Sequence, residues 1–244
     1  MEVLREGIAW FQDPVNWSGD YGIPNRVWEH VWMSGLTTAI GALIALPIGL
    51  LIGHTRRGEF LTISIANIGR ALPSFGVLAL VFPLTFDLPG ELGFWPIVIA
   101  LTLLAIPPIV TNTNVAVREV DQSVVEAARG MGMTGGEILR KIELPLGAPI
   151  IVAGLRTAAV QVVATATLWA LVAGGGLGRY IVDGLVTRTT DPGQLIGGAV
   201  LVALLALVTE LAFNLAQRLT TPRGRSAAAI RTRVRDIEVG QQPA

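Results

Sequence analysis

The sequence contains long stretches without charged side chains. Val31–Gly53 and Leu92–Val117 lack both charged residues and histidine, and Thr157–Gly178 and Pro192–Thr209 are also free of charge. The hydrocarbon core of a bilayer is about 30 Å thick, so a helix needs roughly 20 apolar residues to cross it. A chain in lipid must also satisfy its backbone hydrogen bonds internally. The stretches therefore predict an all-α membrane protein.

Composition supports a membrane protein and limits the chemistry. Of the 244 residues, 52% are hydrophobic and 15% are charged, whereas charged residues make up about 25% of typical soluble domains. The chain has no cysteine, which excludes disulfides, thiolate metal sites and cysteine nucleophiles. The first thirty residues lack a basic start followed by an apolar core, so we expect no cleaved signal peptide.

A fifth crossing is expected between the first two charge-free stretches. Leu61–Phe86 is interrupted by Arg70, and Pro73 follows shortly after. We predict a crossing from about Arg70 to Phe86, with Leu61–Gly69 as a helical approach. Five crossings then divide the chain into an extracytoplasmic or interfacial segment (1–30), a transmembrane domain (31–217) and a basic cytoplasmic tail (218–244).

The basic residues predict the orientation. Short loops rich in Lys and Arg stay cytoplasmic, and with five crossings three basic segments fall on one side: Arg56 and Arg57; Arg118, Arg129, Arg140 and Lys141; Arg218, Arg223, Arg225, Arg231, Arg233 and Arg235. The other side receives Arg5, Arg26, Arg179 and Arg188. We therefore expect a multi-pass protein of the cell membrane with its N-terminus outside and its C-terminus in the cytoplasm. The aromatic residues before and within the first crossing predict an interfacial N-terminal helix: Trp10, Trp17, Tyr21, Trp28 and Trp32.

The insert at 118–145, between the third and fourth crossings, predicts a helix-turn-helix. Apolar or small residues recur there at helical spacing and form a face that needs a partner: Val120, Val124, Ala127, Ala128 and Met131. Gly132 is suited to end that helix in a left-handed conformation. Thr134 and Glu137 form a capping box for a second short helix, with Ile138, Leu139 and Ile142 as its apolar positions. Pro145 and Pro149 mark the start of the fourth crossing.

The same insert resembles the cytoplasmic coupling loop of membrane subunits of type I ATP-binding-cassette importers. The shared pattern is Glu126-Ala127-Ala128, then Gly132, Ile142, Leu144 and Pro145. The resemblance implies a permease core of about five helices whose loop, through Glu126, Ala127, Ala128 and Gly132, docks on a separate ATPase. It implies no catalytic residue in this chain, and places ATP and Mg on the ATPase. A solvated linker is the alternative for this insert.

Further segments resemble the subgroup that imports osmoprotectants such as glycine betaine, carnitine, choline and proline betaine. They include Asn16–Gly19, Arg70–Ser74, Pro108–Thr113, Glu119–Asp121 and Ala173–Gly178, within a match from about residue 14 to 217. The resemblance implies a second permease subunit, identical or related, ATPase subunits, an extracytoplasmic solute-binding protein and no nucleic acid. Importers of methionine and other small solutes share the glycine run, so such a solute remains the alternative.

The glycine run itself permits two interpretations. Gly174, Gly175, Gly176 and Gly178 either end a helix in an irregular stretch or contribute to an outer gate. A nucleotide-binding loop is excluded for this run, because residues 174–178 lack the Gly-x-Gly-x-x-Gly spacing and follow a hydrophobic span. A phosphate-binding Gly-Lys-Ser or Gly-Lys-Thr loop is also excluded, because Lys141, the chain's one lysine, follows Arg140 instead of a glycine.

Polar residues within the crossings are few. Arg156 and Glu210 lie inside the fourth and fifth hydrophobic segments, where an unpaired charge costs at least about 2.5 kcal/mol. They either form an ion pair or reach separately to the interface. Four uncharged residues either line a polar passage or bond between helices: Asn112, Asn114, Gln161 and Asn214.

Two other classes of protein are disfavoured. An enzyme is unsupported, because His30 and His54 lie about 36 Å apart along one helix and no cluster of residues suggests a metal or catalytic site. A secondary transporter is the closer alternative. It commonly has ionisable residues inside the membrane and an inverted repeat, and we find no repeat.

Overall fold

The computed structural model describes residues 2–71, 73–186 and 192–220, and its regular elements there are all helical. In chain order they are α1 (Glu2–Gln12), η1 (Pro14–Trp17), α2 (Ile23–Thr55), α3 (Glu59–Ala71), α4 (Ser74–Leu84), α5 (Phe94–Arg118), α6 (Gln122–Gly130), α7 (Gly135–Ile138), η2 (Leu139–Glu143), α8 (Leu144–Thr165), η3 (Ala166–Val172), α9 (Gly178–Val186) and α10 (Pro192–Thr220). The expectation of an all-α membrane protein is confirmed. Arg188 and the tail beyond residue 220 lie outside the described residues.

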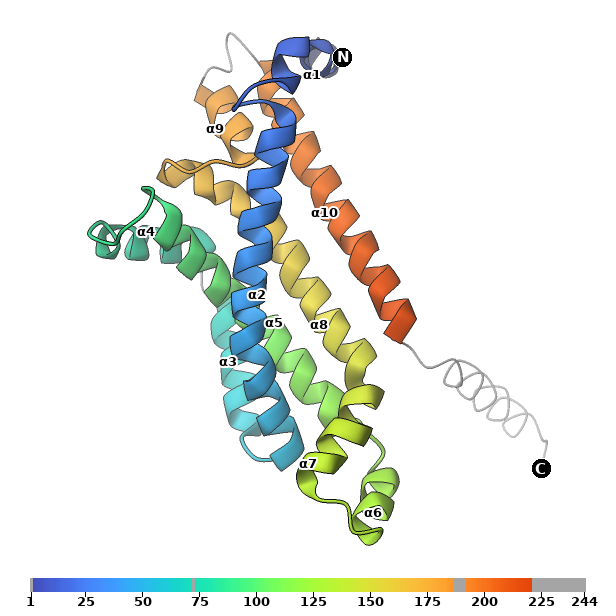
Figure 1. Cartoon of the computed structure of the whole chain (residues 1–244). Coiled ribbons are helices and arrows are strands. Elements are labelled where there is room, and N and C mark those ends of the chain that lie inside the picture. Colours follow the sequence, from blue (N-terminus) through green and yellow to red (C-terminus); the bar gives the residue numbers. More distant parts are fainter. Residues whose placement is uncertain (1, 72, 187–191, 221–244) are drawn as a thin grey trace, which may run out of the picture.

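Four helices within the described residues are long and apolar enough to cross a membrane: Ile23–Thr55, Phe94–Arg118, Gly135–Val172 and Pro192–Thr220. Figure 1 shows them as an elongated bundle, with α1 and α9 at one end and α6 and α7 at the other. We call these the α1 end and the loop end. The first, third and fifth predicted crossings are confirmed as helices, although α2 and α10 extend beyond the predicted limits.

The helices α2 and α5 pack along a seam of small residues. On α2 a small residue recurs at every fourth position: Gly41, Ala45, Gly49 and Gly53. A Cβ added to Gly49 would lie 2.7 Å from Cβ of Thr113 and 2.9 Å from the carbonyl oxygen of Val110. Helices in lipid gain little from hydrophobic burial against each other, so such close backbone packing is a main source of their association. The seam therefore fixes the distance between α2 and α5.

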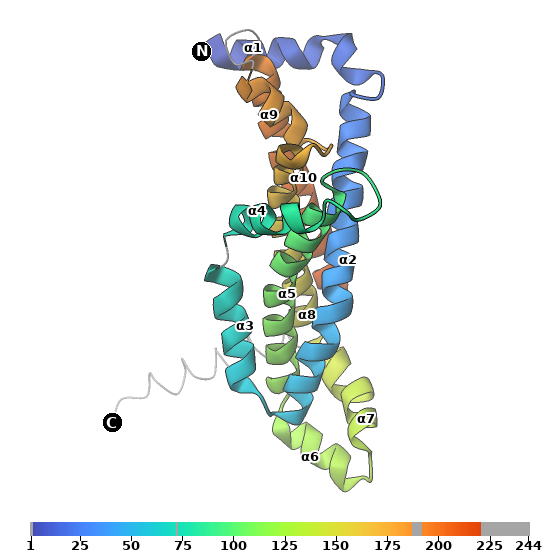
Figure 2. The same cartoon turned by 90° about the vertical axis from the view of Figure 1, so that its left-hand side faces the viewer.

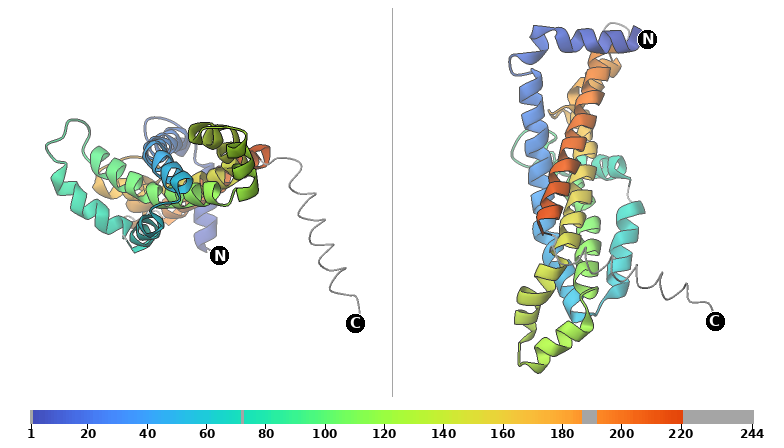
Figure 3. Two further views of the ribbon diagram at one scale, coloured as in Figure 1. Left: turned by 90° about the horizontal axis from the view of Figure 1, so that it is seen from below. Right: turned by 90° about the vertical axis from the view of Figure 1, so that its right-hand side faces the viewer.

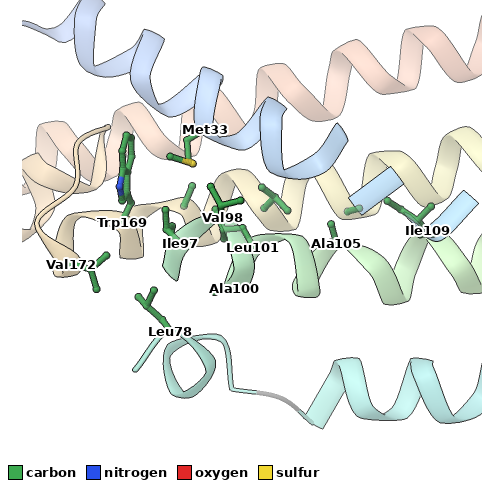
Figure 4. Packing of buried hydrophobic residues seen from close by; sticks show 14 of the residues in the cluster. Met33, Leu78, Ile97, Val98, Ala100, Leu101, Ala105, Ile109, Trp169 and Val172 are labelled. Carbon is green, nitrogen blue, oxygen red and sulfur yellow. The ribbon is translucent and has the colours of Figure 1, made fainter. Parts of the chain in front are cut away.

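Buried apolar side chains extend this contact toward the α1 end. Met33 of α2 and Ile97 and Leu101 of α5 are almost completely buried, and Trp169 of η3 packs in the same cluster. Figure 4 shows Leu78 of α4 pointing toward these side chains from the other side. The core thus joins α2, α4 and η3 to α5.

The predicted helical approach Leu61–Gly69 is confirmed as part of α3, but the predicted crossing from about Arg70 to Phe86 is wrong. α3 ends at Ala71, and α4 begins at Ser74 after the extended Pro73 (φ −70°, ψ 114°). With its 11 residues α4 is about 16 Å long, too short to cross a bilayer. Figure 2 shows α3 running along the bundle and α4 lying across it. Both α2 and α5 run toward the loop end and finish there. Between them, α3 and α4 together carry the chain back toward the α1 end, as a single crossing helix would.

The fourth predicted crossing does not begin as a separate helix. Gly135–Val172 is one continuous helical rod, in which α7 passes through the π turn η2 into α8. Pro145 lies in the first turn of α8, where it was predicted to mark the start of the crossing, whereas Pro149 lies inside α8. The π turn directly precedes Pro145, and a local change of helical register is one way to accommodate a missing proline N–H.

The α1 end is closed by the N-terminal helix. Figure 3 shows α1 lying across the ends of α2 and α10. Trp10 of α1 is buried and packs edge-on against Tyr180 of α9, with ring centroids 5.1 Å apart. Gly197 of α10 leaves room for the Trp10 ring. The other four aromatic residues of the predicted cluster are exposed, as expected for rings at a headgroup layer: Trp17, Tyr21, Trp28 and Trp32.

The seam makes a prediction that a matched substitution can test. Gly49→Ala should lower the free energy of unfolding by about 1–3 kcal/mol, because the new methyl group would overlap Thr113. Gly35→Ala is the control, since Gly35 lies in the same helix and a Cβ there meets nothing within 4 Å. Thermal unfolding in detergent measures both. If the Gly49→Ala protein is as stable as the Gly35→Ala protein, the close packing of α2 on α5 at Gly49 is contradicted.

Candidate functional site: the 118–145 loop and the polar groove

The 118–145 loop begins with a firmly capped helix. Asp121 precedes α6, and its carboxylate accepts hydrogen bonds from the backbone N–H of Ser123 (2.9 Å) and from the Ser123 hydroxyl (2.8 Å). These bonds lower the pKa of Asp121 below its ordinary value. A charged carboxylate at this position also complements the positive end of the helix dipole.

Gly132 ends α6 as predicted. Its φ of +84° is left-handed, and its N–H donates to the carbonyl of Arg129 (3.0 Å). The next N–H, of Met133, donates to the carbonyl of Ala128 (3.2 Å). This pair of bonds is the Schellman pattern. It turns the chain sharply toward α7.

The predicted capping box at the start of α7 is also confirmed. The Glu137 carboxylate accepts hydrogen bonds from the backbone N–H and the hydroxyl of Thr134, both at 3.0 Å. Glu137 also pairs with Lys141 on the surface at 2.9 Å. Hydrogen bonds therefore fix the turn between α6 and α7 at the end of α6 and at the start of α7.

The apolar face predicted for α6 is divided in two. Val125 and Ala128 face inward and pack with Val120 and Ile138 into a small core of the loop itself. Ala128 is only 1% exposed, so its predicted place on a docking surface is wrong. The reason is that α7 folds back and covers this side of α6.

The other side of α6 remains open. Val124, Ala127 and Met131, at positions i, i+3 and i+7, are exposed, and so are Glu126 and Gly132. We call these five residues the open face. Of the remaining motif residues, Ile142 and Leu144 are half-buried and Pro145 is exposed. The loop thus presents two apolar side chains, two small residues and one carboxylate toward the surroundings, at the far end of the bundle (Figure 1).

A polar groove of about 570 Å³ lies between the α3–α4 junction, α5 and α8. Its polar side chains are Ser74, Thr111, Asn112, Thr157, Gln161 and Thr165. None of the described residues that line it is charged or aromatic. Of the four uncharged polar residues noted in the sequence, Asn112 and Gln161 lie in this groove, whereas Asn114 is buried and Asn214 is half-buried on α10. The groove exists because α3 and α4 do not continue as one helix against α5 and α8.

The glycine run forms an ordered segment against α2. Gly176 has a left-handed φ of +75°, and its N–H donates to Oε2 of Glu29 at 2.7 Å. The N–H of Leu177 donates to Nδ1 of His30 at 3.2 Å. Since Nδ1 accepts, the ring proton is on Nε2, which donates to the carbonyl of Val163 at 2.9 Å. We call residues 173–178 the glycine segment.

The other glycines of this segment permit close packing. A Cβ at Gly174 would meet the ring of Trp169, one at Gly175 the carboxylate of Glu29, and one at Gly178 the backbone of Thr167. The segment is therefore an irregular stretch at the α1 end of the bundle, fixed by its neighbours. Its predicted role as a gate stays a prediction.

The structure brings Arg156 and Glu210 together. Nη1 of Arg156 on α8 lies 3.4 Å from Oε1 of Glu210 on α10, and the side chains are 27% and 42% exposed. Arg156 lies in the middle of α8. The pair joins two helices that lie side by side (Figure 3).

Sequence reasoning missed two polar contacts that hold α2 at its ends. Glu29 and His30 bind the glycine segment, and His54 binds Glu143 of the 118–145 loop. The histidines were noted only as flanking the first crossing. Histidine and glutamate at the limits of a charge-free stretch are a signal that could have suggested them, but not their partners, which lie far along the chain.

Comparison with known proteins identifies the family. The model of the family described as "Binding-protein-dependent transport system inner membrane component" matches residues 45–226. The chain belongs to this family. It is a multi-pass membrane permease, and the resemblance that the 118–145 loop suggested is confirmed.

Several proteins similar to this permease are named as permeases for osmoprotectants. The choline transport system permease protein OpuBB of Bacillus subtilis is 38% identical over 199 residues, which cover 82% of this chain and 88% of the relative. The glycine betaine/carnitine/choline permease OpuCB of the same organism is 36% identical over 196 residues, covering 80% and 87%. The osmoprotectant import permease OsmW of Salmonella typhimurium is 33% identical over 203 residues, covering 83% and 93%.

Solved structures agree on the fold of the permease. An inward-facing structure of the MetNI methionine ABC transporter is similar with a TM-score of 0.70 and 27% identity, covering 80% of this chain and 94% of that one. An amino acid ABC transporter is similar with a TM-score of 0.65 and 18% identity, covering 79% and 91%, which shows the shared fold alone.

The glycine segment makes a testable prediction. Gly176→Ala should reduce solute uptake while the permease still assembles, because alanine at a φ of +75° is strained by about 1–2 kcal/mol and its methyl group would lie 3.1 Å from Nδ1 of His30. Gly19→Ala is the control, since Gly19 has a similar φ of +77° in open space. Uptake and the yield of purified complex are measured together. Normal uptake by Gly176→Ala would dismiss a gating role.

Proposed function

We propose that this permease is the membrane subunit of an ATP-driven importer of small osmoprotectants such as glycine betaine, choline, carnitine or proline betaine. The observation that carries the proposal is the open face of α6, where Glu126, Ala127 and Gly132 are exposed while Ala128 is buried beneath them. The small residues Ala127 and Gly132 let a partner approach the backbone closely, and the exposed Val124 and Met131 offer it apolar contact. The chain itself supplies no catalytic residue.

The proposed partner of the open face is a separate ATPase subunit that holds ATP and Mg. The loop is internally packed and capped at three points, so it can pass on a displacement as a rigid unit. Its helix α7 runs without a break into α8. Closure of two ATPase subunits on ATP would then tilt the membrane helices between two states, in alternating access.

The polar groove is proposed as part of the passage. Hydroxyl and amide groups such as those of Thr157, Asn112 and Gln161 can replace some of the hydration of a small polar solute. Without a charge or an aromatic cage in its described lining, the groove would bind a quaternary ammonium group weakly. Selectivity would then reside in an extracytoplasmic solute-binding protein, and the permease would release solute readily.

A pair of permease subunits, identical or related, is proposed to enclose the passage. The groove is open on one side of the single chain, and a two-fold partner would close it. Lipid would cover the remaining apolar surface, including α10, where Leu204, Leu207 and Leu211 are exposed.

The proposed orientation places the loop end in the cytoplasm. Among the described residues, six basic side chains belong to segments at that end: Arg56, Arg57, Arg118, Arg129, Arg140 and Lys141. Arg218 lies in the last turn of α10, away from the α1 end (Figure 1). The α1 end has Arg5, Arg26 and Arg179. This asymmetry supports an N-terminus outside and a C-terminus inside.

Two interpretations of the solute are separable by experiment. Relatives named for choline, glycine betaine and carnitine are 36–38% identical, whereas the methionine transporter structure is 27% identical, which favours an osmoprotectant. Uptake by the reconstituted complex should be measured for glycine betaine, choline, carnitine, proline betaine and methionine. We expect uptake of at least one of the first four. Uptake of methionine alone would overturn the proposed substrate class.

Docking makes a separate prediction. Ala127→Trp and Gly132→Trp should each release the ATPase from the purified complex or uncouple ATP hydrolysis from uptake, because a bulky ring on the open face blocks close approach. Gly132→Asn is the control, since asparagine tolerates the left-handed conformation and remains small. Copurification of the ATPase and membrane insertion are measured for each variant. Full coupling in both tryptophan variants would remove the docking proposal.

A further inference from the structure

The 118–145 loop is tied to α2 by a short contact that lies outside the importer motif. Nδ1 of His54, in the last turn of α2, is 2.6 Å from Oε2 of Glu143. The Glu143 side chain is 5% exposed and the His54 side chain 24% exposed, so water competes little for this hydrogen bond. The other ring nitrogen of His54 faces the start of α7, where a Cβ on Gly135 would lie 3.2 Å from Nε2. His54 thus bonds to Glu143 and leaves little room for a side chain at position 135.

Glu143 is the last residue of the π turn η2. In η2 the N–H of Leu144 donates to the carbonyl of Leu139, five positions earlier. One added residue rotates the following helix by about 100° relative to an uninterrupted α-helix. Glu143 lies between Ile142 and Leu144 of the motif, yet it is buried toward α2 while Pro145 is exposed. π turns are frequent at functional sites.

The loop is connected to the other central helices through the chain itself. α5 leads into α6 within three residues, and α7 continues through η2 into α8. A displacement of the loop therefore moves α5 and α8 directly. Glu143 and His54 are 89 positions apart in sequence, so α2 can follow the loop only through contacts in space. These contacts are the seam with α5 and, at the point where α2 meets the loop itself, the buried His54–Glu143 bond.

At its other end α2 holds the glycine segment. Glu29 and His30 accept the N–H groups of Gly176 and Leu177. His30 and His54 are both on α2, about 36 Å apart at the rise of an α-helix. One helix therefore joins the 118–145 loop to the glycine segment, with a polar contact at each end.

We propose that His54 and Glu143 form a positioning contact that transmits displacement of the 118–145 loop to α2, and through α2 to the glycine segment. This inference rests on the proposed docking of an ATPase at the open face. A contact that only maintained the shape of the loop would cause loss of docking when broken. A contact that transmits movement causes loss of transport while docking and ATP hydrolysis persist.

The test uses the full complex of the permease pair with its ATPase and binding protein in proteoliposomes. The number of ATP molecules hydrolysed per molecule imported is measured with radiolabelled choline and glycine betaine. His54→Ala and Glu143→Ala should each raise this ratio about tenfold, because a buried hydrogen bond is lost. The double variant should be no worse than the worse single one, since both changes break the same contact.

Two matched controls accompany these variants. Glu143→Gln retains an acceptor for His54 and should stay within about twofold of the unmodified ratio. Lys141→Ala removes the exposed pair with Glu137 in the same loop and should leave the ratio unchanged. If Glu143→Ala does not fold, His54→Ala carries the test, because His54 is the more exposed partner.

Two results would overturn the inference. One is an unchanged ratio in His54→Ala, and the other is loss of the ATPase from the purified complex of that variant, which would make the contact structural. Failure of the docking proposal would be seen elsewhere, as full coupling of Ala127→Trp and Gly132→Trp. Loss of docking in those two variants with an unchanged ratio in His54→Ala would refute the positioning contact alone.

Discussion

The close packing of α2 on α5 is the constraint on which the remaining structure depends. Between two helices in lipid there is little hydrophobic gain, so the glycine positions of α2 and the backbone of α5 must meet directly. Gly49 and Gly53 leave no room for a side chain against Thr113 and Val117. Once α2 is fixed to α5, both helices end together at the loop end, and the 118–145 loop can be held by α5, α8 and His54 at the same time.

The same constraint separates a rigid part of the molecule from an open one. α2, α5 and α8 pack closely, whereas α3 and α4 are joined at Pro73 and leave a polar groove beside α5 and α8. A passage for a polar solute needs such a surface, and a transmitted movement needs such a rigid unit. The arrangement therefore supports the proposal that displacement of the loop moves the membrane helices.

Much of the fold was predictable from the sequence, because charge-free stretches, left-handed glycines and capping boxes are local signals. Such signals predict the all-α fold class. They also predict that Gly132 ends α6 and that Thr134 and Glu137 form a capping box. The break at Pro73 and the continuous passage of α7 into α8 were not predicted, since both depend on how neighbouring helices satisfy the backbone. Likewise the burial of Ala128 and the partners of His30 and His54 depend on residues distant in sequence. Tertiary packing decided these features, and no local pattern contained them.

The central claim is that movement of the 118–145 loop by an ATPase drives import through this chain. It is tested most directly by uptake of choline and glycine betaine into proteoliposomes that contain the whole complex, with either the active ATPase or a catalytically inactive one that still docks. The account predicts ATP-dependent accumulation with the first and none with the second. Accumulation that persists with the inactive ATPase would contradict it and would indicate a secondary transporter.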